Sequence, residues 1–109
     1  PSSLYSQLDV ILLCFSVASL GSFSILNDKW IPYIQSCCPT TPTILVGTQS
    51  DQRGPASIYL PSEVAPEDPF SLRDRIQSNS YIECSAATGY NIDQLILAIA
   101  SITRKSSDF

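Results

Sequence analysis

Three short strand-like segments constrain the fold of this 109-residue chain most strongly. Two of them are apolar runs, at 10–17 (apart from Ser16) and at 43–47, and the third is a short strand-like element at 81–84 that contains Glu83. Runs that are continuously apolar, without alternation, are typical of strands covered on both faces, as in a parallel sheet. Because segments with helical spacing separate and follow them, the order β-α-β-α-β-α predicts an α/β fold with three parallel strands and crossover helices.

The first helix is expected over 22–35, with Ser22 capping its start. Pro32 should weaken or kink its last turns, because proline cannot donate the backbone hydrogen bond. Trp30 is most simply a packing residue of this helix, although an exposed tryptophan could also contact a partner. The apolar positions at helical spacing are Phe23, Leu26, Trp30 and Ile34.

Two further helices are expected. A short one over 69–77 would have Asp68 as N-cap and Pro69 as its first residue, and would bury Leu72 and Ile76. In the last helix Asn91 can cap the start, and Gln94 three residues later resembles a capping box. This helix should fade near Thr103. Its expected apolar face consists of Ile92, Leu95, Ile96 and Ile99.

Composition excludes several functional classes. The net charge is −4 without a basic cluster, which argues against nucleic acid as a partner. No apolar run approaches the ~20 residues of a membrane span, and no signal peptide precedes the core. The chain has no histidine and no C-x-x-C pair, so no metal site is expected. Cys14 and Cys84 are expected in the core, and a reduced, cytoplasmic location fits best.

Hydrophobic residues make up 44% of the chain and charged residues only 15%. Globular domains usually carry about 25% charged residues. One interpretation is a compact α/β domain with a buried sheet. The other is half of a domain, whose excess apolar surface was meant for strands that this sequence lacks.

Four blocks occur in the order that the Rho family of Ras-like GTPases has them, and together they resemble that family from about residue 5 to 102. The last two resemble the Wrch/Chp-like branch in particular. The blocks are D-V-I-L-L-C-F-S-V at 9–17, S-F with K-W-I-P between 22 and 32, I-L-V-G-T-Q-S-D at 44–51, and S-Y-I-E-C-S-A at 80–86.

The resemblance implies a guanine site. In such proteins an aspartate in the position of Asp51 accepts two hydrogen bonds from guanine, which offers a ring N–H and an exocyclic amine, whereas adenine does not. Ser85 and Ala86 would present backbone N–H groups to the guanine carbonyl. A solvated turn aspartate is the alternative for Asp51, and an ordinary turn is the alternative for 85–86. The whole implied set is Thr48, Gln49, Asp51, Cys84, Ser85 and Ala86.

The resemblance also implies a GTP-binding molecular switch in signal transduction, for cytoskeletal or polarity control. GTP or GDP would be the ligand, and exchange factors, GTPase-activating proteins and effectors would be the partners. The expected fold is a partial P-loop GTPase, with 1–103 as the C-terminal portion of the domain and 104–109 as a short polar tail. Proteins of this family often end in a lipidated cysteine, but no cysteine follows Cys84, so this chain should carry no membrane anchor.

The phosphate-binding motifs of the family are missing. The sequence contains no G-x-x-x-x-G-K-[S/T], and neither the switch threonine nor the catalytic glutamine has a counterpart. The D-Q-R-G at 51–54 is a chance D-x-x-G, because Asp51 cannot serve both base and metal. We therefore expect the chain to begin just after the second switch, to contain no catalytic residue and to be inactive alone, with magnesium bound only in an intact protein.

Three matters stay open at this point. The stretch 52–66 is shorter than the usual insert of the family, so a helix there is undecided. A non-enzymatic pseudo-GTPase, acting as an interaction module through the back surface of the fold, is the main alternative function. An unrelated flavodoxin-like half that binds another ligand is a third hypothesis.

Overall fold

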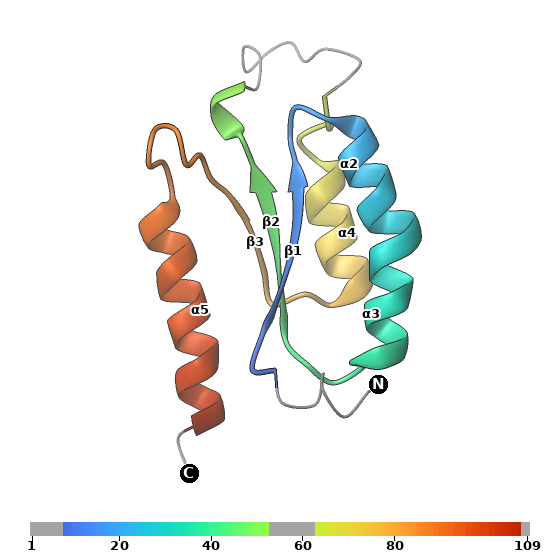
Figure 1. Ribbon diagram of the computed structural model, residues 1–109, viewed down its shortest axis with the longest axis vertical. Helices are drawn as coiled ribbons and strands as arrows, with labels where there is room; N and C mark the ends of the chain where they lie inside the picture. Colours follow the sequence, from blue (N-terminus) through green and yellow to red (C-terminus); the bar gives the residue numbers. More distant parts are fainter. Residues whose placement is uncertain (1–7, 53–62, 108–109) are drawn as a thin grey trace.

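Three parallel strands form the centre of the molecule (Figure 1). The computed structural model describes residues 8–52 and 63–107, with 104–107 as backbone alone. The middle strand pairs in parallel with both neighbours, Ile11 beside Thr43 and Ile44 beside Ser80. The predicted α/β architecture with three parallel strands is therefore confirmed. The strands, in spatial order, are β1 (Ile11–Ser16), β2 (Thr43–Thr48) and β3 (Ser80–Glu83).

The first crossover is helical throughout but changes its winding. It consists of α2 (Leu20–Ile25), a π-helical turn η1 (Leu26–Trp30) and α3 (Ile31–Cys37). Ser19, not Ser22, caps its start: Ser19 has extended backbone, and its hydroxyl accepts from the Ser22 N–H at 3.2 Å. The prediction of Ser22 as cap was wrong because only the residue ahead of the first turn can present its side chain to the free N–H groups.

Pro32 accounts for the π-helical turn. Proline lacks the N–H that would continue the regular ladder, and the Ile31 N–H bonds the Leu26 carbonyl, five residues back. A wide turn holds an extra residue and rotates the apolar stripe. Ile31 consequently faces the core at 3% exposure, whereas Trp30 is 56% exposed. The prediction of Trp30 as a packing residue was therefore wrong.

The second crossover contains α4 (Asp68–Ile76). The helix starts one residue earlier than predicted, with Glu67 in the cap position, so Asp68 is its first residue and not its N-cap. Leu72 is buried at 3% exposure and Ile76 packs against the same cluster, which confirms the predicted face. Most of the stretch in which an insert helix was considered, 53–62, lies outside the described residues.

The last helix, α5 (Ile92–Ser107), runs beyond Thr103, where it was expected to fade. The Asn91 side chain does not act as the expected cap acceptor: its amide donates to the Glu83 carbonyl at 2.9 Å. Ile96 is 56% exposed, so its assignment to the buried face was wrong. The residues of α5 that pack on the sheet are Ile92, Leu95, Ala98, Ile99 and Ile102.

The two faces of the sheet are covered unequally. Helices α2, α3 and α4 lie on one face and α5 lies on the other (Figure 1). On the first face Leu13, Leu45 and Tyr81 are buried. On the second face α5 packs on Ile44 of β2, while Leu12 and Cys14 of β1 are exposed. The expected burial of Cys14 was wrong, because side chains alternate along a strand and no described element covers β1 on that side.

Candidate functional site

Two loops meet at the carboxyl end of the sheet. One is the 3₁₀ turn η2 (Ser50–Gln52), which follows β2, and the other is the loop that follows β3. The Ser50 N–H donates to the Cys84 carbonyl at 3.1 Å, and the Cys84 N–H donates to the Gly47 carbonyl at 2.8 Å. These backbone bonds extend the β2–β3 pairing past the strand ends, so the two loops keep a fixed separation.

Asp51 is the centre of this junction. Its Oδ1 accepts from the Ser85 hydroxyl at 2.7 Å, and its Oδ2 accepts from the Gln52 amide at 2.9 Å. Ser85 is fully buried, and its Oγ also accepts from the Thr88 N–H at 3.2 Å. The hydrogen bonds from Ser85 and then Gln52, together with its own backbone N–H, hold the pKa of Asp51 below its usual 3.8, against a smaller opposite effect of burial. Asp51 is therefore a carboxylate at neutral pH.

Thr48 and Gln49 are held by the neighbouring strand. The Thr48 hydroxyl donates to the Phe15 carbonyl at 3.1 Å. Gln49 has a left-handed backbone, with φ 58°, and its Oε1 accepts from the Ser16 hydroxyl at 2.5 Å. Both side chains are thus tied to the end of β1, which orients the loop that carries Asp51.

The loop after β3 offers fewer free donors than the sequence suggested. The Ser85 N–H donates to the Tyr90 carbonyl at 3.0 Å, so this backbone donor is already engaged. Among the described residues no hydrogen bond occupies the Ala86 N–H, and Ala86 is exposed. Burial raises the pKa of the Cys84 thiol above its usual 9.0, so this cysteine is a neutral wall residue.

A hollow of about 280 Å³ opens between the two loops. Five of the six predicted site residues line it, and Ser85 lies behind Asp51 instead. Sequence reasoning missed Gln52, Ala87 and Ile92 as lining residues. Ile92 had a visible signal as an apolar residue close behind the C-S-A block, but it was assigned only to the helix face. The lining residues are Thr48, Gln49, Asp51, Gln52, Cys84, Ala86, Ala87 and Ile92.

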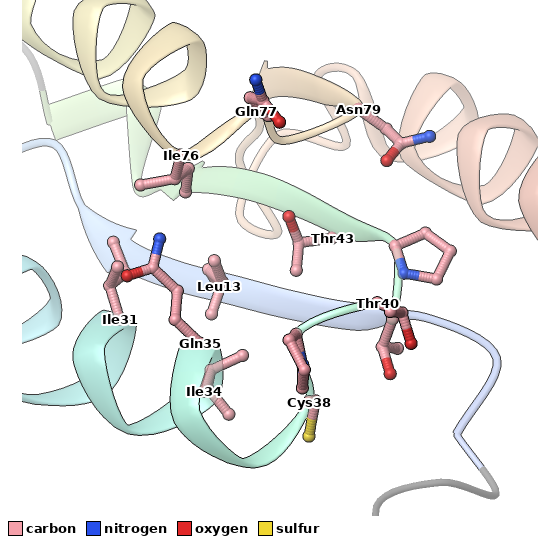
Figure 2. A pocket seen from close by; sticks show the side chains of 13 residues that line it. Leu13, Ile31, Ile34, Gln35, Cys38, Thr40, Thr43, Ile76, Gln77 and Asn79 are labelled. Atoms are coloured by element: carbon pink, nitrogen blue, oxygen red, sulfur yellow. The ribbon is translucent and has the colours of Figure 1, made fainter.

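A second hollow, of about 350 Å³, lies at the amino ends of β2 and β3 (Figure 2). Its walls are the apolar side chains of Leu13, Ile31, Ile34 and Ile76, and its rim carries Gln35, Thr40, Gln77 and Asn79. None of its lining residues is Asp, Glu, Lys, Arg or His. It therefore lacks the charged acceptor that distinguishes the Asp51 hollow, although it is the larger of the two.

Metal ligation finds no support within 8–52 and 63–107: no group of three or more His, Cys, Asp and Glu side chains there could hold an ion. The cysteines Cys14, Cys37, Cys38 and Cys84 are all free thiols. In the same part of the chain, no helix combines the length and apolar character needed to cross a bilayer.

Three parallel strands joined by crossover helices fit a partial Ras-like GTPase domain, and comparison with known proteins agrees. The profile of the Ras family matches residues 1–105, and the chain belongs to this family. It is 39% identical over 93 residues to the Rho-related GTP-binding protein RhoH of Mus musculus, an alignment that covers 84% of the chain and 47% of that relative. The chain thus spans about half the length of the relative it matches.

Proposed function

We propose that this chain is the guanine-recognising half of a Rho-type GTP-binding switch in signal transduction, with cytoskeletal or polarity control as its setting. Membership of the Ras family and the similarity to a Rho-related protein support the class. The Wrch/Chp-like branch stays a prediction. The length of the match, 47% of the relative, supports the view that the phosphate-binding half lies elsewhere.

One observation carries the proposal: the Asp51 carboxylate stands at the carboxyl end of β2, fixed at 2.7 Å by a fully buried serine from the neighbouring strand's loop. A solvated turn aspartate would have no such partner. A carboxylate fixed in this way is preorganised to accept paired N–H donors, because its orientation is set before the ligand arrives. Guanine supplies such a pair in its ring N–H and exocyclic amine.

The remaining site residues take supporting roles. The exposed Ala86 N–H is the backbone donor for the guanine carbonyl, while Ser85 acts through its hydroxyl on Asp51. Gln49 lays its aliphatic stem along the base, held in place by Ser16. Thr48 and Cys84 shape the wall of the hollow. None of these residues performs chemistry on the phosphates.

The described residues contact only the base. Magnesium and the phosphates of GTP or GDP require groups other than those at this junction, and exchange factors, GTPase-activating proteins and effectors enter as partners by family. The division into a GTPase domain over 1–103 and a short polar tail over 104–109 stays a prediction, and α5 crosses that boundary to Ser107. Four free thiols fit a cytoplasmic setting.

An interaction module is the second candidate function, and one observation favours it. Trp30 is 56% exposed and Tyr33 is 45% exposed, and their rings meet edge to face with centroids 6.4 Å apart. Exposed aromatic pairs are common anchors of protein interfaces. A protein that used only this surface would not need the nucleotide, so nucleotide binding separates the two candidates.

The decisive experiment replaces Asp51 by asparagine in the intact GTPase, meaning this chain together with the proposed phosphate-binding half. Asp51→Asn exchanges one carboxylate oxygen for an amine donor, which would face guanine's own amine. Xanthine has a carbonyl at that position, so the affinity of the variant for xanthine should rise relative to its affinity for guanine. A site built around a buried hydrogen-bond pair discriminates by up to about 10⁴-fold, so competition between GTP and XTP should reverse in favour of XTP.

Asp28→Asn serves as the matched control, because Asp28 is exposed on η1 and loses the same charge far from the hollow. It should leave both affinities unchanged. Unchanged GTP and XTP affinities in Asp51→Asn would refute the proposal. An equal loss of both nucleotides, with a lowered melting temperature, would show that Asp51 is structural and refute it as well.

A further inference from the structure

Both oxygens of Asp51 already accept a hydrogen bond from the chain itself. The two donors differ in how firmly they are held. Ser85 is fully buried, does not line the hollow, and is fixed by the Thr88 N–H. Gln52 is exposed, lines the hollow, and its amide has no second hydrogen bond among the described residues.

The two donors also approach the Asp51 carboxylate from different sides. The Ser85 hydroxyl reaches Oδ1 from the sheet side, behind the wall of the hollow. The Gln52 amide reaches Oδ2 at 2.9 Å from a residue that lines the hollow, where a ligand must enter. Gln52 is also the second cause, after Ser85, of the lowered pKa of Asp51.

The Gln52 carboxamide and guanine present the same chemistry to Asp51. Each offers a planar, neutral N–H₂ donor, Nε2 in glutamine and the exocyclic amine in the base. We infer that Gln52 is a built-in competitor of guanine, whose side-chain amide holds Oδ2 of Asp51 and must swing away before the exocyclic amine can bind. This inference rests on the proposed function of the Asp51 hollow.

Competition of this kind lowers the apparent affinity by the fraction of molecules in which Oδ2 is open. A hydrogen bond from an exposed amide to a carboxylate keeps most, but not all, molecules closed. Removing the Gln52 donor should therefore tighten guanine nucleotide binding by about 3–10-fold. A nucleotide that needs only one oxygen of Asp51 should gain less, because Gln52 can stay on the other.

The test uses Gln52→Met in the intact GTPase, since methionine keeps the length of the side chain and lacks the donor. Dissociation constants are measured for GDP and for inosine diphosphate, whose base keeps the ring N–H and lacks the exocyclic amine. Gln52→Met should bind GDP about 3–10-fold more tightly, and its preference for GDP over inosine diphosphate should rise. Gln52→Leu should behave in the same way.

Gln35→Met is the matched control, because Gln35 is an exposed glutamine that lines the opposite hollow. It should change neither constant. Unchanged or weaker GDP binding in both Gln52 variants, with normal melting temperatures, would overturn the inference. If Asp51→Asn still favours XTP in that case, the proposed function stands and only the role of Gln52 fails. If Asp51→Asn has no effect either, both fail.

Discussion

Gln49 and Gln77 have the same side chain and the same backbone conformation at opposite ends of the sheet. Their φ angles are 58° and 57°, and both residues are exposed. Gln49 follows β2 at the carboxyl end and lines the Asp51 hollow. Gln77 follows α4 at the amino end and lines the second hollow. The left-handed region costs a non-glycine residue about 1–2 kcal/mol, so each position needs an explanation.

The two explanations differ. At Gln77 the backbone is sufficient: its N–H bonds the carbonyls of Arg73 and Asp74, and the Ser78 N–H bonds Arg73 at 3.0 Å, which closes the end of α4. At Gln49 the side chain matters as well, because its carboxamide is bonded to Ser16 of β1. The same conformation ends a helix in one place and orients a pocket wall in the other. In the smaller Asp51 hollow, hydrogen bonds hold polar side chains in fixed orientations. In the larger hollow, polar side chains lie only at the rim.

The largest effect is expected at Gly47, next to the loop that carries Gln49. A Cβ atom there would lie 2.5 Å from the Tyr81 hydroxyl and 2.8 Å from Val17 Cγ1. Gly47→Ala should therefore displace Tyr81 from its 2.6 Å hydrogen bond with Glu83 and lower the free energy of unfolding by about 1–3 kcal/mol. Denaturant unfolding of the intact GTPase measures this.

Gly21→Ala is the control for Gly47→Ala. A Cβ atom at Gly21 would meet only the Ser19 hydroxyl, at 3.8 Å, and the residue lies in α2. Alanine is favoured over glycine in a helix by about 1 kcal/mol, so this variant should gain stability. A similar loss in both variants would mean that the close approach at Gly47 does not determine the outcome.

A pair of glycine substitutions tests the comparison of the two glutamines directly. Gln77→Gly should raise the free energy of unfolding by about 0.5–1 kcal/mol, because glycine relieves the left-handed strain and no side-chain bond is lost. Gln49→Gly relieves the same strain but loses the bond to Ser16. Guanine affinity should then fall by about 3–10-fold in Gln49→Gly alone. Nucleotide titration and denaturant unfolding of both variants measure this. Equal guanine affinities in Gln49→Gly and Gln77→Gly would show that the two glutamines do not differ in their effect on the site.

The sequence was sufficient for the three-stranded parallel sheet, whereas the guanine-binding role of Asp51 stays a prediction. The apolar runs at 10–17 and 43–47 predicted strands covered on both faces, which is correct for β2 but not for β1, whose Leu12 and Cys14 are exposed. Asp51 and Ser85 were identified through the family resemblance, which also placed their loops together. What followed from local chemistry alone was less secure: Ser22 and Asp68 were assigned as caps one turn or one residue away from the true start.

Other features depended on contacts that no local pattern records. The exposure of Cys14 depends on how far α5 extends over the sheet, and α5 packs on β2 without covering β1. Ile31, and not Trp30, lies in the core because of the π-helical turn before Pro32. Gln52 follows Asp51 directly in the chain, yet its contact with Oδ2 depends on the 3₁₀ turn that folds it back.

The smallest expected effect is a change of stability with pH. It should differ between Asp51, at the carboxyl end of the sheet, and Cys38, at the amino end. The pKa of Asp51 is lowered from 3.8, first by the Ser85 hydrogen bond, so its contribution to stability is present above that pH and is lost only as the pH falls through the still lower folded value. The pKa of Cys38, in the second hollow, is raised from 9.0, first by burial and then by Cys37. Its thiol must stay neutral, so stability should fall as the pH rises above 9.0.

Between about pH 5 and 8 neither group changes its charge, and guanine affinity and unfolding free energy should both be flat with respect to Asp51 and Cys38. The measurement is the difference in unfolding free energy between the wild type and each of Asp51→Asn and Cys38→Ala as a function of pH. The Asp51 difference should vary only on the acid side and the Cys38 difference only on the alkaline side. If the difference in unfolding free energy between the wild type and Asp51→Asn changed near pH 6, Ser85 would not be holding the Asp51 carboxyl in its charged form. The proposal of a preorganised acceptor would then lose its physical basis.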